Sequence, residues 1–477
     1  KINRTAYEIC VLKTLRERLR CREIWVVGSR RYRDPEEDLP QDFEIRRESY
    51  YSELGVPLDA KAYTQALREE MSLNLKALNN GMPGNPRVKI VAGKDGSRIS
   101  ISPYEALPDP ENIVAIKQEI IKRWSGTSLL DVLKETDLRV SFTQWLRSGT
   151  ERTTMDKTTL QRRLLLCLFG LGTNAGIKNM ESKPLDDYKE LLYVRRRFFS
   201  IEGLRQAITQ VVNATLEVRL PQVWGETTTA CASDSKQFGA WDENLLTEWH
   251  VRYGGRGVMV YWHVEKNAVC IYSQFKRVSS SEVGAMINGV LRHCTEMEVD
   301  RQYVDSHGQS TVAFAFCRLL GFELMPRLKA IDKQKLYRPE PGLAYSNLEK
   351  IMSPKAIKWE LIENPMDTLV KHAVALKLGM TDAESLLRRF TKNNVQHPAY
   401  KGFVELGKAI KTIFLTRYLA SEDLRREIHA GLMSSKLGMA RMILSSLAKA
   451  GNWLQIDKRI KRLACFVYTF SNPVLFS

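Results

Sequence analysis

The segment 225–330 constrains the fold most, because runs of β-branched and aromatic residues replace the helical periodicity that precedes them. We predict a first strand over TTACASD, which ends at Asp234. RGVMVYWHVE and AVCIYSQFK form the next two strands, with a turn around Lys266 and Asn267. The helical pattern SSSEVGAMINGVLRHC then precedes a fourth strand in RQYVDSHG, which ends at Asp305. A second helix, STVAFAFCRLLG, leads to a short fifth strand, FELMPRL.

This order of elements predicts an α/β domain, and it matches the ribonuclease-H-like fold with its mixed sheet. In that fold the first and fourth strands are parallel neighbours, so their carboxyl ends meet at one edge of the sheet. Asp234 and Asp305 are therefore expected to lie close together. Each acid alone is more typical of a cap or a turn, and the interpretation rests on both acids ending the correct strands.

Two converging carboxylates repel each other unless a cation neutralises them. Magnesium suits the position, because hard cations take oxygen ligands and leave room for phosphate oxygens. A pair of such ions, about 4 Å apart, activates a hydroxyl and stabilises a leaving oxygen in phosphodiester transfer. The sequence thus predicts phosphodiester chemistry with Asp234 and Asp305 as metal ligands.

We expect four segments along the chain. Residues 1–111 are mostly helical, with a short strand EIWVV and a β-hairpin around Asp95 and Gly96, and are typical of a dimerisation or linker region. Residues 112–224 form a helical scaffold, and 225–432 form the catalytic domain with a helical insertion after about 340. Residues 433–477 are a separate tail.

The charge favours a polyanionic partner. Lys and Arg outnumber Asp and Glu by 72 to 55, which gives a net charge of +17 and favours nucleic acid over a membrane. A basic surface without a binding role is the alternative. No signal core or apolar run of spanning length is present, and the eight cysteines form no Cys-x-x-Cys pair. We therefore expect a cytoplasmic protein, whose true beginning is expected to be missing.

Two further places are candidates for DNA contact. Arg195, Arg196 and Arg197 lie among aromatic residues in YVRRRFF, a combination that suits phosphate contact beside base stacking. A solvated helix face with aromatic packing behind it explains the same pattern equally well. His307 is suited to a phosphate contact or to a structural role in a tight turn.

Long motifs resemble one family. ACASDSKQFGAWDENLLTEWHVRYGGRGVMVYWHV, YVDSHGQS and FAFCRLLGFELMPRLKAI are similar to the catalytic core of the large transposases of the Tn-three family of replicative transposons. EIWVVGSRRYRDPEEDLP, LLDVLKETDLRVSFT and LQRRLLLCLFGLGTNAG resemble the middle region of the same family, and the likeness runs through nearly all of 1–431. It suggests the C-terminal half of a longer protein.

The resemblance implies a DDE-type polynucleotidyl transferase that nicks transposon ends and joins their 3′-hydroxyls to target DNA, leaving a cointegrate. It implies two Mg²⁺ ions, with Mn²⁺ as a substitute, and places Asp234 and Asp305 as the first two metal-binding acids. The implied partners are double-stranded DNA, as terminal inverted repeats and target, and a second copy in a homodimer. The implied location is the bacterial cytoplasm, at the nucleoid when the protein is on DNA.

The third acid departs from the family pattern. The family has Leu-Asn-x-x-Glu, whereas this chain continues from RYLASEDLRREIHAGL to MSSKL, so Lys436 stands at the position of the glutamate. Reading the codons for Met433 to Lys436 one nucleotide earlier permits Asn-Val-Val-Glu, and we hypothesise that 433–477 is out-of-frame translation. That tail has seven basic residues and one acid. The expected function is an impaired transposase; the alternatives are an inactive remnant that binds DNA or dimerises and, less favoured, a structure-specific nuclease.

Overall fold

The computed structural model describes residues 3–433 apart from 30–31, 94–95, 106–107, 124–127, 150–154, 174, 221, 223–228, 241–242, 266–268 and 391–396. The predicted turn at Lys266 and Asn267, Asp95 and Lys436 lie outside the described residues. The chain forms two compact units: the first is Lys1–Ser102, Ser280–Leu291 and Val299–Ala430, and the second is Pro103–Ser279, Arg292–Glu298 and Gly431–Ser477. The domain bounds expected from the sequence stay a prediction.

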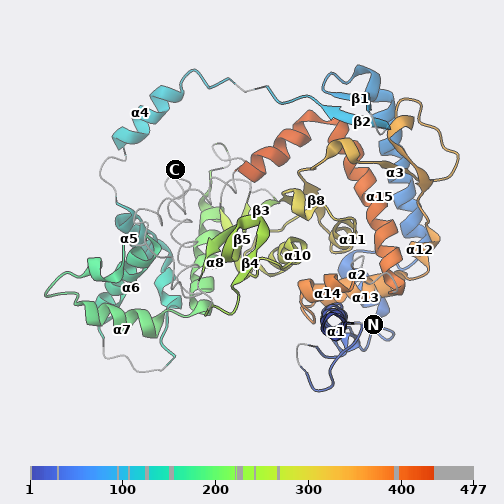
Figure 1. The fold of residues 1–477 in the computed structure, drawn as a ribbon. Coiled ribbons are helices and arrows are strands. Elements are labelled where there is room, and N and C mark those ends of the chain that lie inside the picture. Colours follow the sequence, from blue (N-terminus) through green and yellow to red (C-terminus); the bar gives the residue numbers. More distant parts are fainter. Residues whose placement is uncertain are drawn as a thin grey trace. The chain divides into compact units, whose positions relative to one another are not determined.

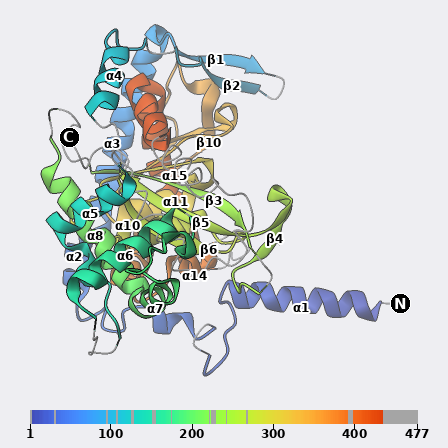
Figure 2. The ribbon, with the colours of Figure 1, turned by 90° about the vertical axis from the view of Figure 1, so that its left-hand side faces the viewer.

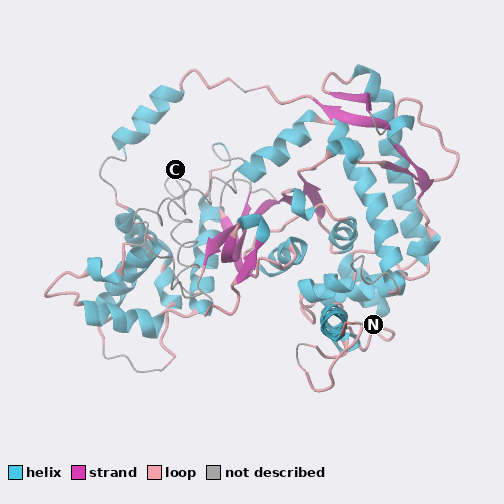
Figure 3. Cartoon of the chain, viewed as in Figure 1, coloured by secondary structure: helices cyan, strands magenta, loops and turns pink. Residues whose placement is uncertain are grey.

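The helical periodicity before residue 220 is confirmed, as the colouring by secondary structure shows (Figure 3). Helices also follow residue 340, and their place as an insertion in the catalytic domain stays a prediction. The helices of the N-terminal half are α1 (Arg4–Arg20), α2 (Arg47–Leu54), α3 (Ala60–Gly81), α4 (Ile113–Arg123), α5 (Leu129–Val140), α6 (Lys157–Gly172), α7 (Tyr188–Phe198) and α8 (Ile201–Val218). Later helices are α10 (Glu282–Arg292), α11 (Thr311–Leu319), α12 (Glu360–Glu363), α13 (Met366–Lys377), α14 (Ala383–Arg389), α15 (Pro398–Ala420) and one over 422–433. Within the described chain, no helix has both the length and the apolar character needed to cross a bilayer.

The first unit is built around α15, which packs against α3 and α11 (Figure 1). Phe403 of α15 stacks on Phe316 of α11 with ring centroids 4.2 Å apart, and both side chains are buried. Close approach of these two helices requires a small residue, because a Cβ at Gly407 would lie 1.9 Å from the Thr311 carbonyl oxygen. This packing fixes the start of α11.

The same unit contains three pairs of strands. The predicted hairpin is confirmed as the antiparallel pair β1 (Val88–Gly93) and β2 (Gly96–Ile101). The predicted fourth and fifth strands are β7 (Arg301–Val304) and β8 (Glu323–Pro326), which pair in parallel. A parallel pair needs a crossover between its strands, and α11 supplies it. Two short strands, β9 (Leu336–Arg338) and β10 (Met352–Ala356), complete the set.

The second unit combines a helical cluster with an antiparallel sheet. Apolar faces of α5, α6, α7 and α8 form its helical core, which includes Leu133, Leu168, Leu191 and Leu204. In the sheet, β5 (Gly255–Glu265) pairs with β3 (Ala230–Gly239), β4 (Glu248–His250) and β6 (Cys270–Lys276). The predicted strand RGVMVYWHVE is confirmed as β5, and nearly all of its side chains are buried, as its long apolar run favours.

Two predicted strand positions are wrong. EIWVV forms no strand: residues 23–27 are turn, bend and irregular backbone, and the Val27 side chain is 93% exposed. A β-branched run without a strand to pair with does not form a ladder. The first strand of the α/β segment does not end at Asp234, since β3 continues to Gly239 and pairs with β5 over that whole length. Asp234 is therefore a mid-strand residue.

Candidate functional site

Asp305 is the first residue after β7, as predicted. The strand is fixed by burial, since Tyr303 and Val304 are at most 1% exposed. Asp305 forms the N-terminal boundary of a short 3₁₀ turn, Ser306–Gly308, but its side chain makes no capping hydrogen bond there. The half-buried carboxylate is thus held by its backbone while its oxygens are not used to cap the turn.

Gly308 makes the turn after Asp305 tight. Its backbone N–H donates to the Asp305 carbonyl oxygen at 2.9 Å. A Cβ at Gly308 would lie 2.4 Å from Cγ2 of Val304, so a larger residue would displace the end of the strand. The side chain of His307, the predicted phosphate contact in this turn, lies outside the described residues.

Basic residues follow β8 at the edge where Asp305 follows β7. Val304 is in register with Pro326, and the Arg327 backbone N–H donates to the Val304 carbonyl oxygen at 2.9 Å. The Lys329 backbone N–H donates to the Gln309 side chain at 3.3 Å. The carboxyl edge of this parallel pair therefore joins an acid to two cationic residues, which suits a metal-bound phosphate. Our reading of the sequence missed Arg327 and Lys329, because only the parallel register reveals which residues flank Asp305.

The strand that leads to Asp305 is tied to the helix over 422–433. Tyr303 donates to a carboxylate oxygen of Glu427 at 2.5 Å, and Arg301 donates to the same oxygen at 3.3 Å. Burial, together with this hydrogen bond to the charged Glu427, raises the pKa of Tyr303 well above its usual value. The phenol therefore remains protonated at physiological pH and can donate to Glu427.

Asp234 lies in the middle of β3, half-buried and opposite Trp262 of β5. One of its carboxylate oxygens accepts a hydrogen bond from the Ser235 backbone N–H at 2.8 Å. The neighbouring Ser233 is buried, and its hydroxyl is 2.9 Å from that of Tyr261. Asp234 belongs to the second unit and Asp305 to the first, so their convergence stays a prediction.

The arginine triplet lies in the last turn of α7. Behind it, Phe198 packs into the buried helical core, as the solvated-face reading expected. Tyr193 on the same helix is 45% exposed, and the Arg197 guanidinium lies 5.7 Å from the centre of its ring. Cations in the last helical turn also interact favourably with the helix dipole. The contribution of Arg195, Arg196 and Arg197 to DNA contact stays a prediction.

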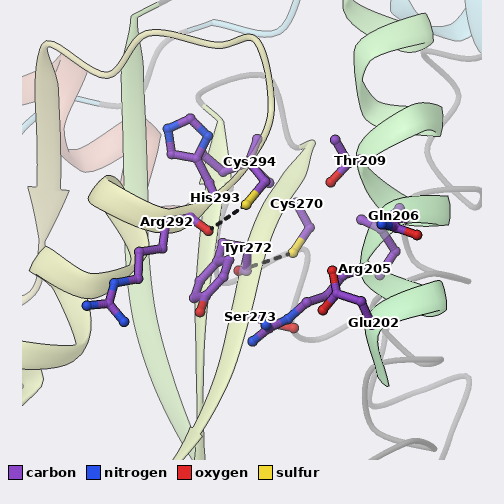
Figure 4. A pocket seen from close by; sticks show the side chains of 12 residues that line it. Glu202, Arg205, Gln206, Thr209, Cys270, Tyr272, Ser273, Arg292, His293 and Cys294 are labelled. Atoms are coloured by element: carbon purple, nitrogen blue, oxygen red, sulfur yellow. Dashed lines mark hydrogen bonds between the residues drawn. The ribbon is translucent and has the colours of Figure 1, made fainter. Parts of the chain in front are cut away.

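The second unit contains a pocket (Figure 4). Its volume is about 100 Å³, and one wall is formed by α8 while another is formed by β6. Arg205 lies over the ring of Tyr272 at 5.7 Å, and the partly buried His293 has its pKa lowered by burial. Neither Asp234 nor Asp305 lines this pocket, so the pocket is not part of the candidate site.

Comparison with protein families identifies the family of the chain. A family model described as "Tn3 transposase DDE domain" matches residues 131–435, more than half of the chain, and the chain belongs to this family. The matched range includes both Asp234 and Asp305. The family resemblance inferred from the sequence is thus confirmed.

Curated relatives resemble the chain over most of its length. The transposase for transposon Tn1546 of Enterococcus faecium is 26% identical over 459 residues, which are 93% of this chain and 44% of the relative. The transposase for transposon Tn501 of Pseudomonas aeruginosa is 27% identical over 458 residues, which are 94% of this chain and 44% of the relative. The chain spans less than half the length of these relatives.

Proposed function

We propose that this chain carries the catalytic chemistry of DNA transposition: metal-dependent nicking at transposon ends, followed by transfer of the 3′-hydroxyl ends to target DNA with formation of a cointegrate. The observation that carries the proposal is Asp305, whose carboxylate follows a buried parallel strand and does not cap the turn after it. Family membership and the names of the relatives support the same chemistry.

The donor set fits a divalent ion in part. Asp305 and Asp234 offer carboxylate oxygens, the ligands that Mg²⁺ and Mn²⁺ prefer. Among the described residues, no group of three or more His, Cys, Asp or Glu side chains is placed to hold a metal. The position of the family's third acid is Lys436, outside those residues. When bound, such an ion would activate an attacking hydroxyl and stabilise the leaving oxygen.

The chain's own residues would hold and orient the DNA. Arg327 and Lys329 would bind the phosphates beside Asp305, because they follow β8 at the edge where Asp305 follows β7. The ribonuclease-H-like arrangement would bring Asp234 to the same phosphate. The proposed partners are terminal inverted repeats, target DNA and a second copy of the chain, and the proposed place of action is the bacterial nucleoid.

Metal binding tests the two acids without requiring turnover. We expect Asp305→Asn and Asp234→Asn to weaken Mn²⁺ binding, measured by electron paramagnetic resonance, at least tenfold. Asp300→Asn is the matched control, because Asp300 is an exposed acid just before β7, at its other end. If Asp305→Asn binds Mn²⁺ as tightly as Asp300→Asn, the proposed metal site is wrong.

An inactive remnant that binds DNA and interferes with an active transposase is the second candidate, favoured by the lysine at position 436. Lys436→Glu separates the two candidates. An impaired enzyme should gain nicking of a plasmid that carries transposon ends, and Asp305→Asn should abolish the gain. A Lys436→Glu chain that binds Mn²⁺ yet never nicks would favour the remnant.

The proposed frame change has a direct test. The described part of the chain reaches Met433, where the out-of-frame segment is proposed to start. Sequencing the coding DNA across codons 425–440 should reveal a single-base insertion or deletion whose repair restores the glutamate at position 436. A coding sequence in which no such change restores it would refute the frame hypothesis.

A further inference from the structure

The hairpin formed by β1 and β2 is a two-stranded ribbon with one anchored face (Figure 2). Val88 and Ile99 point to that face, and each is only 2% exposed. The β2 strand packs against two short 3₁₀ segments of the same unit, Ile331–Lys333 and Glu349–Ile351. Side chains alternate along each strand, so the residues next to Val88 and Ile99 in the sequence point to the opposite face.

The opposite face of the ribbon is basic. Lys89 lies opposite Ser100, and Arg98 lies opposite Val91, so both cations are on this face. Lys89, Arg98 and Ser100 are exposed, and neither cation makes an ion pair within the described chain. Arg87 shares the face but is paired with Glu422 at 3.3 Å.

We propose that this outer face, defined by Lys89, Arg98 and Ser100, contacts the phosphate backbone of duplex DNA. Two strands about 5 Å apart fit a major groove about 12 Å wide, and diagonal cross-strand neighbours are about 7–8 Å apart. Lys89 and Arg98 are diagonal neighbours, so their long side chains reach adjacent phosphates while Ser100 offers a hydroxyl donor.

Charge and rigidity favour DNA over a protein partner. The outer face has one apolar residue, the half-buried Val91, and therefore lacks the aromatic anchors of a protein interface. The anchored face holds the backbone in place, so the strands that carry the cations are ordered before binding and less backbone entropy is lost on contact. This inference rests on the proposed function, since it gives the DNA that the chain is proposed to act on a second contact surface, apart from the edge at Asp305.

Duplex binding of the 477-residue chain, measured by fluorescence anisotropy between 0.05 and 0.3 M salt, tests the face. The double variant Lys89→Gln with Arg98→Gln should depend less on salt. The slope of log K against log salt is negative, and it should become shallower by about 1.8, because each lost phosphate contact removes about 0.9. The affinity should fall by roughly 60-fold at 0.1 M salt. Duplexes with and without transposon ends should lose affinity equally, since phosphates carry no sequence.

The matched control removes two exposed lysines elsewhere in the same unit, Lys13→Gln with Lys61→Gln. A charge-preserving pair, Lys89→Arg with Arg98→Lys, should bind as the unchanged chain does, which excludes misfolding as the cause. If the glutamine pair at the hairpin behaves like the control pair, the ribbon is not a DNA contact. If it loses binding of a protein ligand and keeps DNA binding, the proposal is also overturned. Mn²⁺ binding at Asp305 is measured separately, so failure of either proposal is distinguishable.

Discussion

Replacing Gly407 by Ala tests how the packing of α15 on α11 holds the segment that follows Asp305. The added Cβ would lie 1.9 Å from the Thr311 carbonyl oxygen, whereas real Cβ contacts are essentially never shorter than 3.0 Å. The atom in the way belongs to the backbone, so it cannot rotate aside. The two helices must therefore separate by about 1 Å, which also opens the stack of Phe316 on Phe403.

The size of the effect follows from two opposing contributions. Overpacking a core costs about 1–3 kcal/mol, and a backbone obstacle places this substitution near 3 kcal/mol. Alanine has a helix propensity about 1 kcal/mol better than glycine, which offsets part of the cost. We expect a net loss of about 2 kcal/mol in the stability of the first unit, or roughly a 30-fold increase in opening.

Amide hydrogen exchange read by mass spectrometry localises this loss to the peptides of α11 and α15. Gly81→Ala is the matched control, because no atom lies within 4 Å of a Cβ built at Gly81. Thr311 follows Asp305 by six residues, so Gly407→Ala should also weaken Mn²⁺ binding while Gly81→Ala leaves it unchanged. Equal exchange in the two variants would refute the argument.

Three further predictions concern buried polar groups. Tyr303→Phe removes the hydrogen bond to Glu427 and should lower the stability of the first unit by about 1.5–3 kcal/mol. Hydrogen exchange should become faster over 422–433 and stay unchanged in α7. Arg219→Met removes the guanidinium that lies 3.1 Å from the buried Glu265 carboxylate and should lower the free energy of unfolding by about 3–5 kcal/mol, whereas adding Glu265→Gln should recover much of the loss in urea unfolding. Burial lowers the pKa of His372 from the ordinary 6.5 to about 3. Below pH 6.5 the unfolded chain binds a proton at this ring and the folded chain does not, so the stability that is fully present above pH 6.5 is lost as the pH falls towards 3. His372→Phe should flatten that part of the stability profile, and an unchanged acid slope would contradict the assignment.

The strands that the sequence predicted well are those whose own residues decide their burial. The run from Val258 to Val264 is apolar or aromatic on both faces apart from His263, and such a run is stable only as a covered central strand. The residues around Trp25 have a similar β propensity but remain exposed, because no strand of the described segments pairs with them. Propensity alone does not separate these cases, since the difference lies in tertiary pairing.

The candidate site was predictable to a similar extent. Asp305 was found because a buried strand ends in front of it, and both the strand and its end are local features. The position of Asp234 was misjudged because Ser235, Lys236 and Gln237 are polar and suggest the end of a strand. Pairing with β5 extends the ladder through these residues, so the end of β3 is set by the partner and not by the local sequence.

The contact between Tyr303 and Glu427 bears on how the site could regain its third acid. It fixes the helix over 422–433 to the strand that carries Asp305, and it uses only residues before the change in pattern at Met433. Arg425 adds a second anchor, since its guanidinium donates to the carbonyl oxygens of Tyr418 and Leu419 at the end of α15. The approach to position 436 is therefore stabilised independently of the side chain at that position. A Lys436→Glu substitution should for this reason change the chemistry of the site without a change in the stability of the helix that leads to it.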